Sequence, residues 1–313
     1  MSERSGRQAS GTGFQAEASL GSLCPQKQPV AGRHRSDRSG IHGSDGGQNA
    51  GRVAMLWSRL PFPSGATHLM SPYVAEFVGT MMLVLLGNGV CANVNLKKTL
   101  GHNAGWIVIA TGWGLAVAFA VYLVSHISGA HLNPAVTIGL AVIGEFEVPQ
   151  VAGYLASQML GAITGATLVW LAYLPHWKET TDAGAIRGSF CNTPAIPHTI
   201  SNLITEIIGT FALVLGVLAI LRPENLMPDT GFKEGFAPCL VGLMVWSIGL
   251  SLGGPTGYAI NPARDLGPRI AHALLPIANK GNSGWGYSWI PVVGPIVGGI
   301  TAAVFYKALW SAA

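Results

Sequence analysis

The sequence has little charge. Of its 313 residues only 10% are Asp, Glu, Lys or Arg, whereas soluble domains carry about 25% of these residues. The 46 residues from Thr99 to Gly144 contain none of the four. Hydrophobic residues make up 49% of the chain, and its mean hydropathy is +0.41. These values argue against an ordinary soluble domain and favour an integral membrane protein.

The main part of the chain also lacks a basic surface. The net charge is +4, from 18 Lys and Arg against 14 Asp and Glu. Residues 1–70 hold eight basic and four acidic residues, so residues 71–313 hold ten of each and are neutral. The whole excess therefore lies near the N-terminus, and we expect no nucleic-acid partner.

Cysteine pairs and metal-binding spacings are missing too. The four cysteines, Cys24, Cys91, Cys191 and Cys239, form no Cys-x-x-Cys motif and no Cys/His ligand set. No nucleophile–base pair or phosphate-binding loop stands out. We therefore expect buried free thiols, no cofactor, no metal ion and no enzyme activity.

The first 69 residues differ from the rest in composition. They are rich in Gly, Ser, Arg and Gln and poor in aliphatic residues, which predicts a disordered tail over residues 1–70. This tail contains no apolar core typical of a cleaved signal peptide. The first apolar helix begins directly after Met70, so we consider Met70 a candidate natural start and the tail a candidate non-native extension. If the tail is native, its basic residues favour a cytoplasmic N-terminus.

Beyond Met70, six apolar segments are long enough to cross a bilayer, which takes about 20 residues. We predict spans near 72–94, 104–125, 149–173, 200–221, 235–253 and 287–310. Two shorter apolar segments, near 134–143 and 262–275, are too short to cross, and each begins at Asn-Pro-Ala.

The chain also repeats itself. The stretch "AEFVGTMMLVLLG" at 75–87 is similar to "TEIIGTFALVLGV" at 205–217, which aligns Glu76 with Glu206. A Gly-xxx-Gly pair near the end of each half, Gly161/Gly165 and Gly294/Gly298, recurs at an offset of 133, and such pairs allow close helix crossing. The halves, about 71–175 and 200–313, each hold three spans and one short segment. An odd number of spans inverts the second half in the membrane, and inverted repeats with short segments point to a site at the midplane.

Asn-Pro-Ala has the chemistry of a helix start. Proline is tolerated in the first turn, and asparagine is a good N-cap. Two half-helices that meet at the membrane centre would join their N-termini, each carrying roughly half a positive charge. Asn133 and Asn261 would add amide donors there, and the preceding loops would supply carbonyl acceptors. The pore-centre residues are therefore Asn133, Pro134, Ala135, Asn261, Pro262 and Ala263.

The stretches "SGAHLNPAVT" and "TGYAINPARD" resemble the aquaporin and glycerol-facilitator channels, and the resemblance extends over 71–313. It implies an all-α integral membrane fold with six transmembrane helices and two re-entrant half-helices in an inverted repeat. It also implies a homotetramer in the cell membrane, with one pore in each subunit.

The resemblance further implies a selectivity filter, the narrowest part of such a pore, made of Trp113, Gly249, Tyr258 and Arg264. Water-selective members of the family carry histidine where this chain has Gly249, and glycine is expected to leave room for a polyol. Glycerol facilitators often carry phenylalanine where this chain has Tyr258, so the added hydroxyl makes the filter more polar. Asp265 resembles a marker of the glycerol branch, and as a buried carboxylate beside an arginine we expect it to be paired.

Three further residues are interpreted as supports of the loops before the half-helices. The resemblance implies that Glu76 and Glu206 accept hydrogen bonds from these loops. The alternative is that they bind substrate in a proton-coupled carrier, but their symmetry and the lack of another intramembrane relay residue favour support. His131 is expected to orient the first loop and contribute to the pore wall.

The leading interpretation is a passive channel for glycerol and other small neutral solutes such as urea, which also conducts water and excludes ions and protons. A water-selective channel is the second interpretation. An alternating-access carrier, which can also be built from inverted repeats, is the third.

Overall fold

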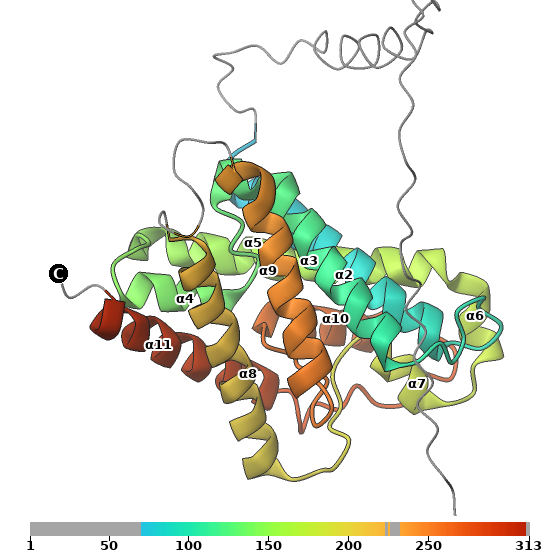
Figure 1. Cartoon of the computed structure of the whole chain (residues 1–313). Coiled ribbons are helices and arrows are strands. Elements are labelled where there is room, and N and C mark those ends of the chain that lie inside the picture. The colour runs from blue at the N-terminus through green and yellow to red at the C-terminus, as the bar shows by residue number, and fades with distance from the viewer. Residues whose placement is uncertain (1–69, 223–224, 226–231, 311–313) are drawn as a thin grey trace, which may run out of the picture. The chain divides into compact units, whose positions relative to one another are not determined.

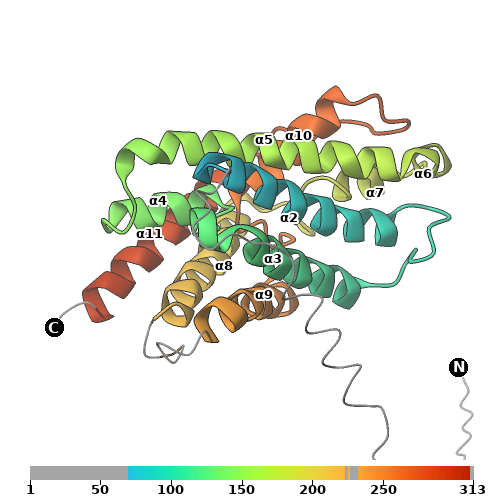
Figure 2. The ribbon, with the colours of Figure 1, turned by 90° about the horizontal axis from the view of Figure 1, so that it is seen from above.

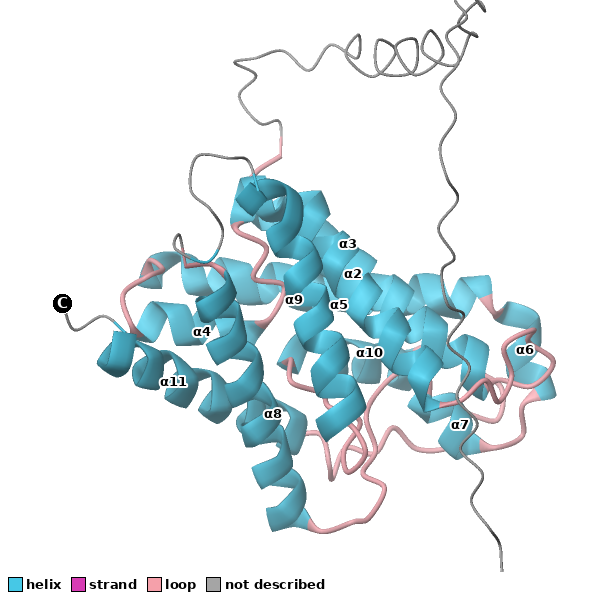
Figure 3. Cartoon of the chain, in the orientation of Figure 1, coloured by secondary structure: helices cyan, strands magenta, loops and turns pink. Residues whose placement is uncertain are grey.

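The computed structural model describes residues 70–222, 225 and 232–310, which form helices and loops and no strand (Figure 3). Six of these helices are long and apolar enough to cross a membrane. They are α2 (Pro72–Asn95), α3 (Trp106–Ser128), α5 (Val148–Ala172), α8 (Thr199–Ile220), α9 (Phe232–Leu252) and α11 (Ile290–Trp310). The six predicted spans are confirmed, with ends that differ by at most three residues. The predicted tail over residues 1–70 lies, except for Met70, outside the described residues.

The two short apolar segments form the half-helices α4 (Pro134–Val142) and α10 (Pro262–Leu274), each with proline in its first turn (Figure 1). The fold class is therefore confirmed. Two further helices, α6 (Leu174–Glu179) and α7 (Ala183–Gly188), lie between the halves and were not predicted. Each has only six residues, too few to show a helical period.

Equivalent helices of the two halves pack in equivalent ways. In the first half α2 packs along α5 (Figure 2), and in the second α8 packs along α11. Glycines make these contacts close. A Cβ at Gly161 would lie 2.3 Å from the carbonyl oxygen of Phe77, and a Cβ at Gly298 would lie 2.4 Å from that of Ile207. The expectation that the matched glycine pairs permit close crossing is confirmed.

The half-helices lock the two halves together, because each packs against the last span of the other half. Helix α4 contacts α11, and α10 contacts α5. A Cβ at Gly139 of α4 would lie 3.0 Å from the carbonyl oxygen of Gly299, and one at Gly267 of α10 would lie 2.5 Å from Cβ of Ala162. The position of each half-helix therefore depends on both halves of the sequence.

We predict that Gly161→Ala lowers the thermal stability of the protein, because its Cβ would overlap a backbone oxygen of α2. Overpacking of this kind costs about 1–3 kcal/mol. Gly89→Ala is the matched control, since Gly89 is also helical and a Cβ there meets nothing within 4 Å. The gain in helix propensity is common to both variants. Unfolding temperatures in detergent should fall for Gly161→Ala alone, and equal temperatures would contradict this account of the helix crossing.

Candidate functional site

The site begins at the N-termini of the half-helices, where each asparagine caps its own helix. Oδ1 of Asn133 accepts the backbone N–H of Ala135 at 2.9 Å. In the second half, Oδ1 of Asn261 accepts the N–H of Ala263 at 3.0 Å. Extended backbone at both asparagines and proline at the next position start the helix abruptly. Each half-helix therefore presents a capped, positively polarised N-terminus.

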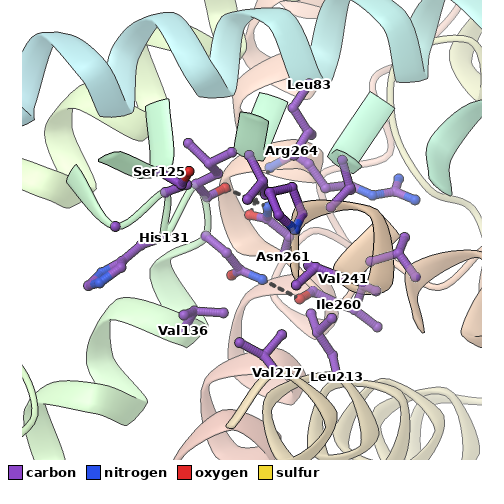
Figure 4. A pocket seen from close by; sticks show the side chains of 18 of the residues that line it. Leu83, Ser125, His131, Val136, Leu213, Val217, Val241, Ile260, Asn261 and Arg264 are labelled. Atoms are coloured by element: carbon purple, nitrogen blue, oxygen red, sulfur yellow. Dashed lines mark hydrogen bonds between the residues drawn. The ribbon is translucent and has the colours of Figure 1, made fainter. Parts of the chain in front are cut away.

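The same two side chains also join the halves. Nδ2 of Asn133 donates to the carbonyl oxygen of Ile260, and Nδ2 of Asn261 donates to that of Leu132, each at 2.8 Å. Both bonds lie in the wall of the cavity that is described below (Figure 4). Each amide thus satisfies an N–H of its own helix and a carbonyl of the opposite loop. The exchange gives non-helical backbone deep in the protein the partners that it needs.

The loops that precede the half-helices share an unusual backbone. Ala130 and Leu132 have φ of 51° and 50°, and Tyr258 and Ile260, each 128 residues later, have φ of 41° and 44°. Non-glycine residues in this left-handed region carry strain of about 1–3 kcal/mol each, so surrounding contacts must fix them. The strain occurs at the same two positions of both repeats.

The two buried glutamates bind these strained loops. Glu76 accepts the backbone N–H groups of His131 and Leu132 at 2.9 and 2.7 Å. Glu206 accepts those of Ala259 and Ile260 at 3.0 and 2.9 Å. The donors are equivalent residues of the repeat, and both carboxylates are at most 1% exposed. Each carboxylate thus meets donors that the helices cannot satisfy.

The first loop has additional side-chain partners. Nε2 of Gln158 bridges Glu76 and Thr137, at 2.8 and 3.0 Å, and Nδ1 of His131 lies 3.1 Å from Oγ1 of Thr137. The ring of His131 also packs against Phe146. His131 lines the cavity described next (Figure 4), so it contacts both the loop and the cavity.

A cavity of about 530 Å³ runs along the two loops. It extends from the face where α3 and α8 end, near Ser125 and Leu221, to Arg264 at its inner end. Aliphatic side chains form most of its wall (Figure 4), including Leu83, Val136, Leu213, Val217 and Val241. The loop residues 129–132 and 258–260 and both capping asparagines also line it. The cavity therefore has one polar side, formed by the two loops, and one apolar side, formed by the aliphatic side chains.

Three of the four predicted filter residues meet at the inner end of this cavity. The guanidinium carbon of Arg264 lies 4.2 Å from the ring centroid of Trp113 and 5.5 Å from that of Tyr258. Nη2 of Arg264 donates to the carbonyl oxygens of Gly257 and Tyr258, each at 3.1 Å. Among the described residues, Nε of Arg264 has no recorded acceptor, so this donor remains for a solute.

The fourth predicted filter residue, Gly249, lies directly against the ring of Tyr258. A Cβ there would lie 2.8 Å from Cζ of Tyr258, and Gly249 is not among the residues that line the cavity. A Cβ at Gly253, one turn later, would lie 2.6 Å from the same ring. The expectation that glycine leaves open space needs correction. The ring of Tyr258 fills that space, because Gly249 near the end of α9 and Gly253 just after it have no side chains that would collide with the ring.

Asp265 is paired with Arg269, one helical turn later, rather than with its neighbour Arg264. Its Oδ1 accepts from Nε and Nη2 of Arg269, at 3.0 and 2.8 Å, and both side chains are fully buried. Nη1 of Arg269 donates to the carbonyl of Ser283 at 2.7 Å. Since Arg269 neutralises Asp265, the positive charge of Arg264 has no carboxylate partner among the described residues.

Asn192, in the connection between α7 and α8, bonds to Arg264, Asp265 and Arg269, and the sequence analysis missed it. Its Oδ1 accepts from Nη1 of Arg264, and its Nδ2 donates to the carbonyl of Thr256 at 2.8 Å. Its backbone N–H donates to Asp265 at 2.7 Å, and its carbonyl accepts from Arg269 at 2.9 Å. A lone asparagine in a loop has no motif, so only the fold reveals this role.

The thiol of Cys191, the residue before Asn192, adds no charge to the cluster of Arg264, Asp265 and Arg269. Burial, assisted by the negative charge of Asp265, raises the pKa of Cys191 to about 12. Cys191 therefore stays a neutral thiol at ordinary pH, and Asp265 is the carboxylate that balances Arg269.

The chain is similar in sequence to known proteins. The family model described as major intrinsic protein matches residues 65–306. The chain belongs to the major intrinsic protein family. It is 62% identical over 241 residues to the probable glycerol uptake facilitator protein of Thermotoga maritima, covering 77% of this chain and all of that protein. It is 57% identical to the glycerol uptake facilitator protein of Bacillus subtilis, covering 76% of this chain and 85% of the relative.

A solved structure has the same fold. The aquaglyceroporin from Plasmodium falciparum matches with a TM-score of 0.68 and 31% identity, covering 76% of this chain and 95% of that one. The predicted glycerol-facilitator branch is therefore confirmed at the level of the family.

We predict that Arg269→Met destabilises the protein by about 3–5 kcal/mol, because it leaves the Asp265 carboxylate buried without its cation. Adding Asp265→Asn should recover part of this loss, since the orphaned charge disappears. Unfolding temperatures of the two single variants and the double variant in detergent provide the measurement. A double variant less stable than Arg269→Met would refute the pairing as the source of the loss.

We also predict that Asn192→Ala lowers glycerol flux several-fold, because Nη1 of Arg264 loses its acceptor. The backbone bonds of residue 192 to Asp265 and Arg269 remain, so the fold should persist. Asn225→Ala is the control, since the side chain of Asn225 donates to the carbonyl of Ala219 near the end of α8 and Asn225 is not among the residues that line the cavity. Stopped-flow light scattering on proteoliposomes measures the flux, and unchanged flux in Asn192→Ala would exclude this role.

Proposed function

We propose that the chain is a passive transmembrane channel for glycerol and other small neutral solutes, that it also conducts water, and that it excludes ions and protons. The observation that carries this proposal is the cavity that ends at Arg264, between the guanidinium and the rings of Trp113 and Tyr258. The names of the two bacterial relatives support glycerol as the solute.

The proposed filter consists of Trp113, Gly249, Tyr258 and Arg264. A polyol has hydroxyls along one edge and carbon along the other. Arg264 would donate to the hydroxyls while the two rings contact the carbon chain. The polar and apolar contacts that the solute loses with water would thus be replaced by contacts of the same kind with the filter. Between Arg264 and the mouth of the cavity near Ser125 and Leu221, the solute would pass the amides of Asn133 and Asn261, with Pro134, Ala135, Pro262 and Ala263 holding the two helix starts together.

Exclusion of cations would follow from three positive features in one narrow path. Arg264 forms no ion pair with a carboxylate of the described residues, and the two half-helix N-termini each add roughly half a charge. In a low-dielectric surrounding these repel a cation strongly. The donors at the centre would also orient a passing water, so that protons cannot move along a continuous chain of waters.

Other parts of the proposal concern support and assembly. Glu76, Glu206 and His131 would hold the loops in their strained form, and Asp265 would leave Arg264 unpaired by binding Arg269 instead. We further propose a channel domain over 71–313, a homotetramer in the cell membrane with a cytoplasmic N-terminus, and an accessory or non-native tail before it.

The proposal is tested by stopped-flow light scattering on proteoliposomes that contain the full chain. We expect glycerol permeability well above that of empty liposomes, without saturation and without sensitivity to an uncoupler. Equal glycerol permeability in the two preparations would overturn the proposal. Water flux driven by sucrose, in the absence of glycerol flux, would identify a water-selective channel, and saturable uptake abolished by the uncoupler would identify a carrier.

We predict that Gly249→His lowers glycerol flux about tenfold or more, equivalent to at least ~1.4 kcal/mol, and lowers water flux less. The imidazole and the ring of Tyr258 compete for the same space, so one of them must enter the path. Gly254→Ala is the control, because a Cβ there meets nothing within 4 Å. An equal loss of both fluxes would show that position 249 does not discriminate between the solutes.

A further inference from the structure

The filter ring of Trp113 is tied to a cysteine outside the filter. Nε1 of Trp113, on α3, donates to Sγ of Cys91, on α2, at 3.3 Å. Trp113 is 3% exposed and Cys91 is 9% exposed, so the bond is shielded from solvent. An indole N–H only donates, and a buried one needs an acceptor. Among the described residues, the thiol is the acceptor recorded for this N–H.

Two further contacts fix the same ring. Gly87 lies one turn before Cys91, and a Cβ there would lie 2.3–2.6 Å from three atoms of the six-membered ring of Trp113. The guanidinium of Arg264 lies 4.2 Å from the ring centroid. Helix α2 therefore provides both a packing surface without a side chain, at Gly87, and an acceptor for the indole N–H, at Cys91. Trp113 and Arg264 both line the cavity, with the guanidinium over the ring.

We propose that Cys91 is a positioning residue of the filter, whose thiol holds the indole of Trp113 in the orientation that admits a polyol. This inference rests on the proposed function and extends it to a residue that does not line the cavity. The thiol acts through one directional bond rather than through bulk, since Gly87 and the neighbouring buried residues already provide the packing.

Removing the Cys91 thiol would leave the indole N–H of Trp113 without an acceptor, which favours a different orientation of the ring. The orphaned N–H would turn toward the cavity, where water or a solute hydroxyl can accept it. The indole would then narrow the path beside Arg264. Glycerol, which fills the path more completely than water, should be slowed more than water. A lost packing contact would give no such preference.

A double-mutant cycle between Cys91 and Trp113 tests the inference in proteoliposomes of the full chain. Cys91→Val is apolar, somewhat larger than cysteine, and lacks an acceptor, whereas Cys91→Ser keeps an acceptor. We expect Cys91→Val to lower glycerol flux roughly threefold or more, and water flux less, while Cys91→Ser keeps most of both. In the Trp113→Phe background, which lacks the N–H, Cys91→Val should change neither flux.

The outcomes separate a positioning role from a packing role. Equal losses from Cys91→Val with Trp or Phe at 113, or equal losses in Cys91→Val and Cys91→Ser, would overturn the inference. Cys91→Ala is the second acceptor-free variant if Cys91→Val does not elute as a folded protein. Cys239→Val, on α9 and outside the cavity lining, is the control and should leave both fluxes unchanged. Absent glycerol flux in the unmutated protein would contradict the proposed function instead, and the same cycle read in water flux would still test Cys91.

Discussion

The structure depends on the crossed hydrogen bonds of Asn133 and Asn261. Non-helical backbone at the depth of a membrane must find partners within the protein or in a wet cavity. Each asparagine caps one half-helix and satisfies a carbonyl of the opposite loop, at 2.8 Å in both directions. The bonds are reciprocal, so neither half completes its loop without the other. The glutamates, the strained residues and the glycine contacts all serve to bring these two amides together.

The charges near the filter are arranged to leave one of them unpaired. Arg264 and Asp265 are neighbours in sequence, yet the helix directs them to different partners. Asp265 faces Arg269, and Arg264 faces the cavity. Asn192 contacts all three through both its side chain and its backbone, so the position of Arg264 is set from outside its own helix. The bonds to Asn192 and to the loop carbonyls thus hold Arg264 in an orientation that faces the cavity.

Much of this arrangement could be predicted from the sequence, because it follows from periodic or repeated features. Long apolar segments gave the spans, and the two Asn-Pro-Ala motifs gave the half-helix starts. The remaining features depend on contacts between distant residues. Asn192 and Gln158 belong to no motif, and α6 and α7 are too short to show a period. The filling of the space at Gly249 by Tyr258 is a matter of side-chain packing, as is the bond between Cys91 and Trp113.

The central claim is that the two joined helix ends and Arg264 pass neutral solutes and stop charge. The most direct test loads proteoliposomes with a pH-sensitive dye, sets a potassium diffusion potential, and records glycerol flux and internal pH together. The account predicts rapid glycerol flux that does not depend on the potential, with internal pH following that of empty liposomes. Proton entry that accompanies glycerol flux, or grows with the potential beyond that of empty liposomes, would contradict it.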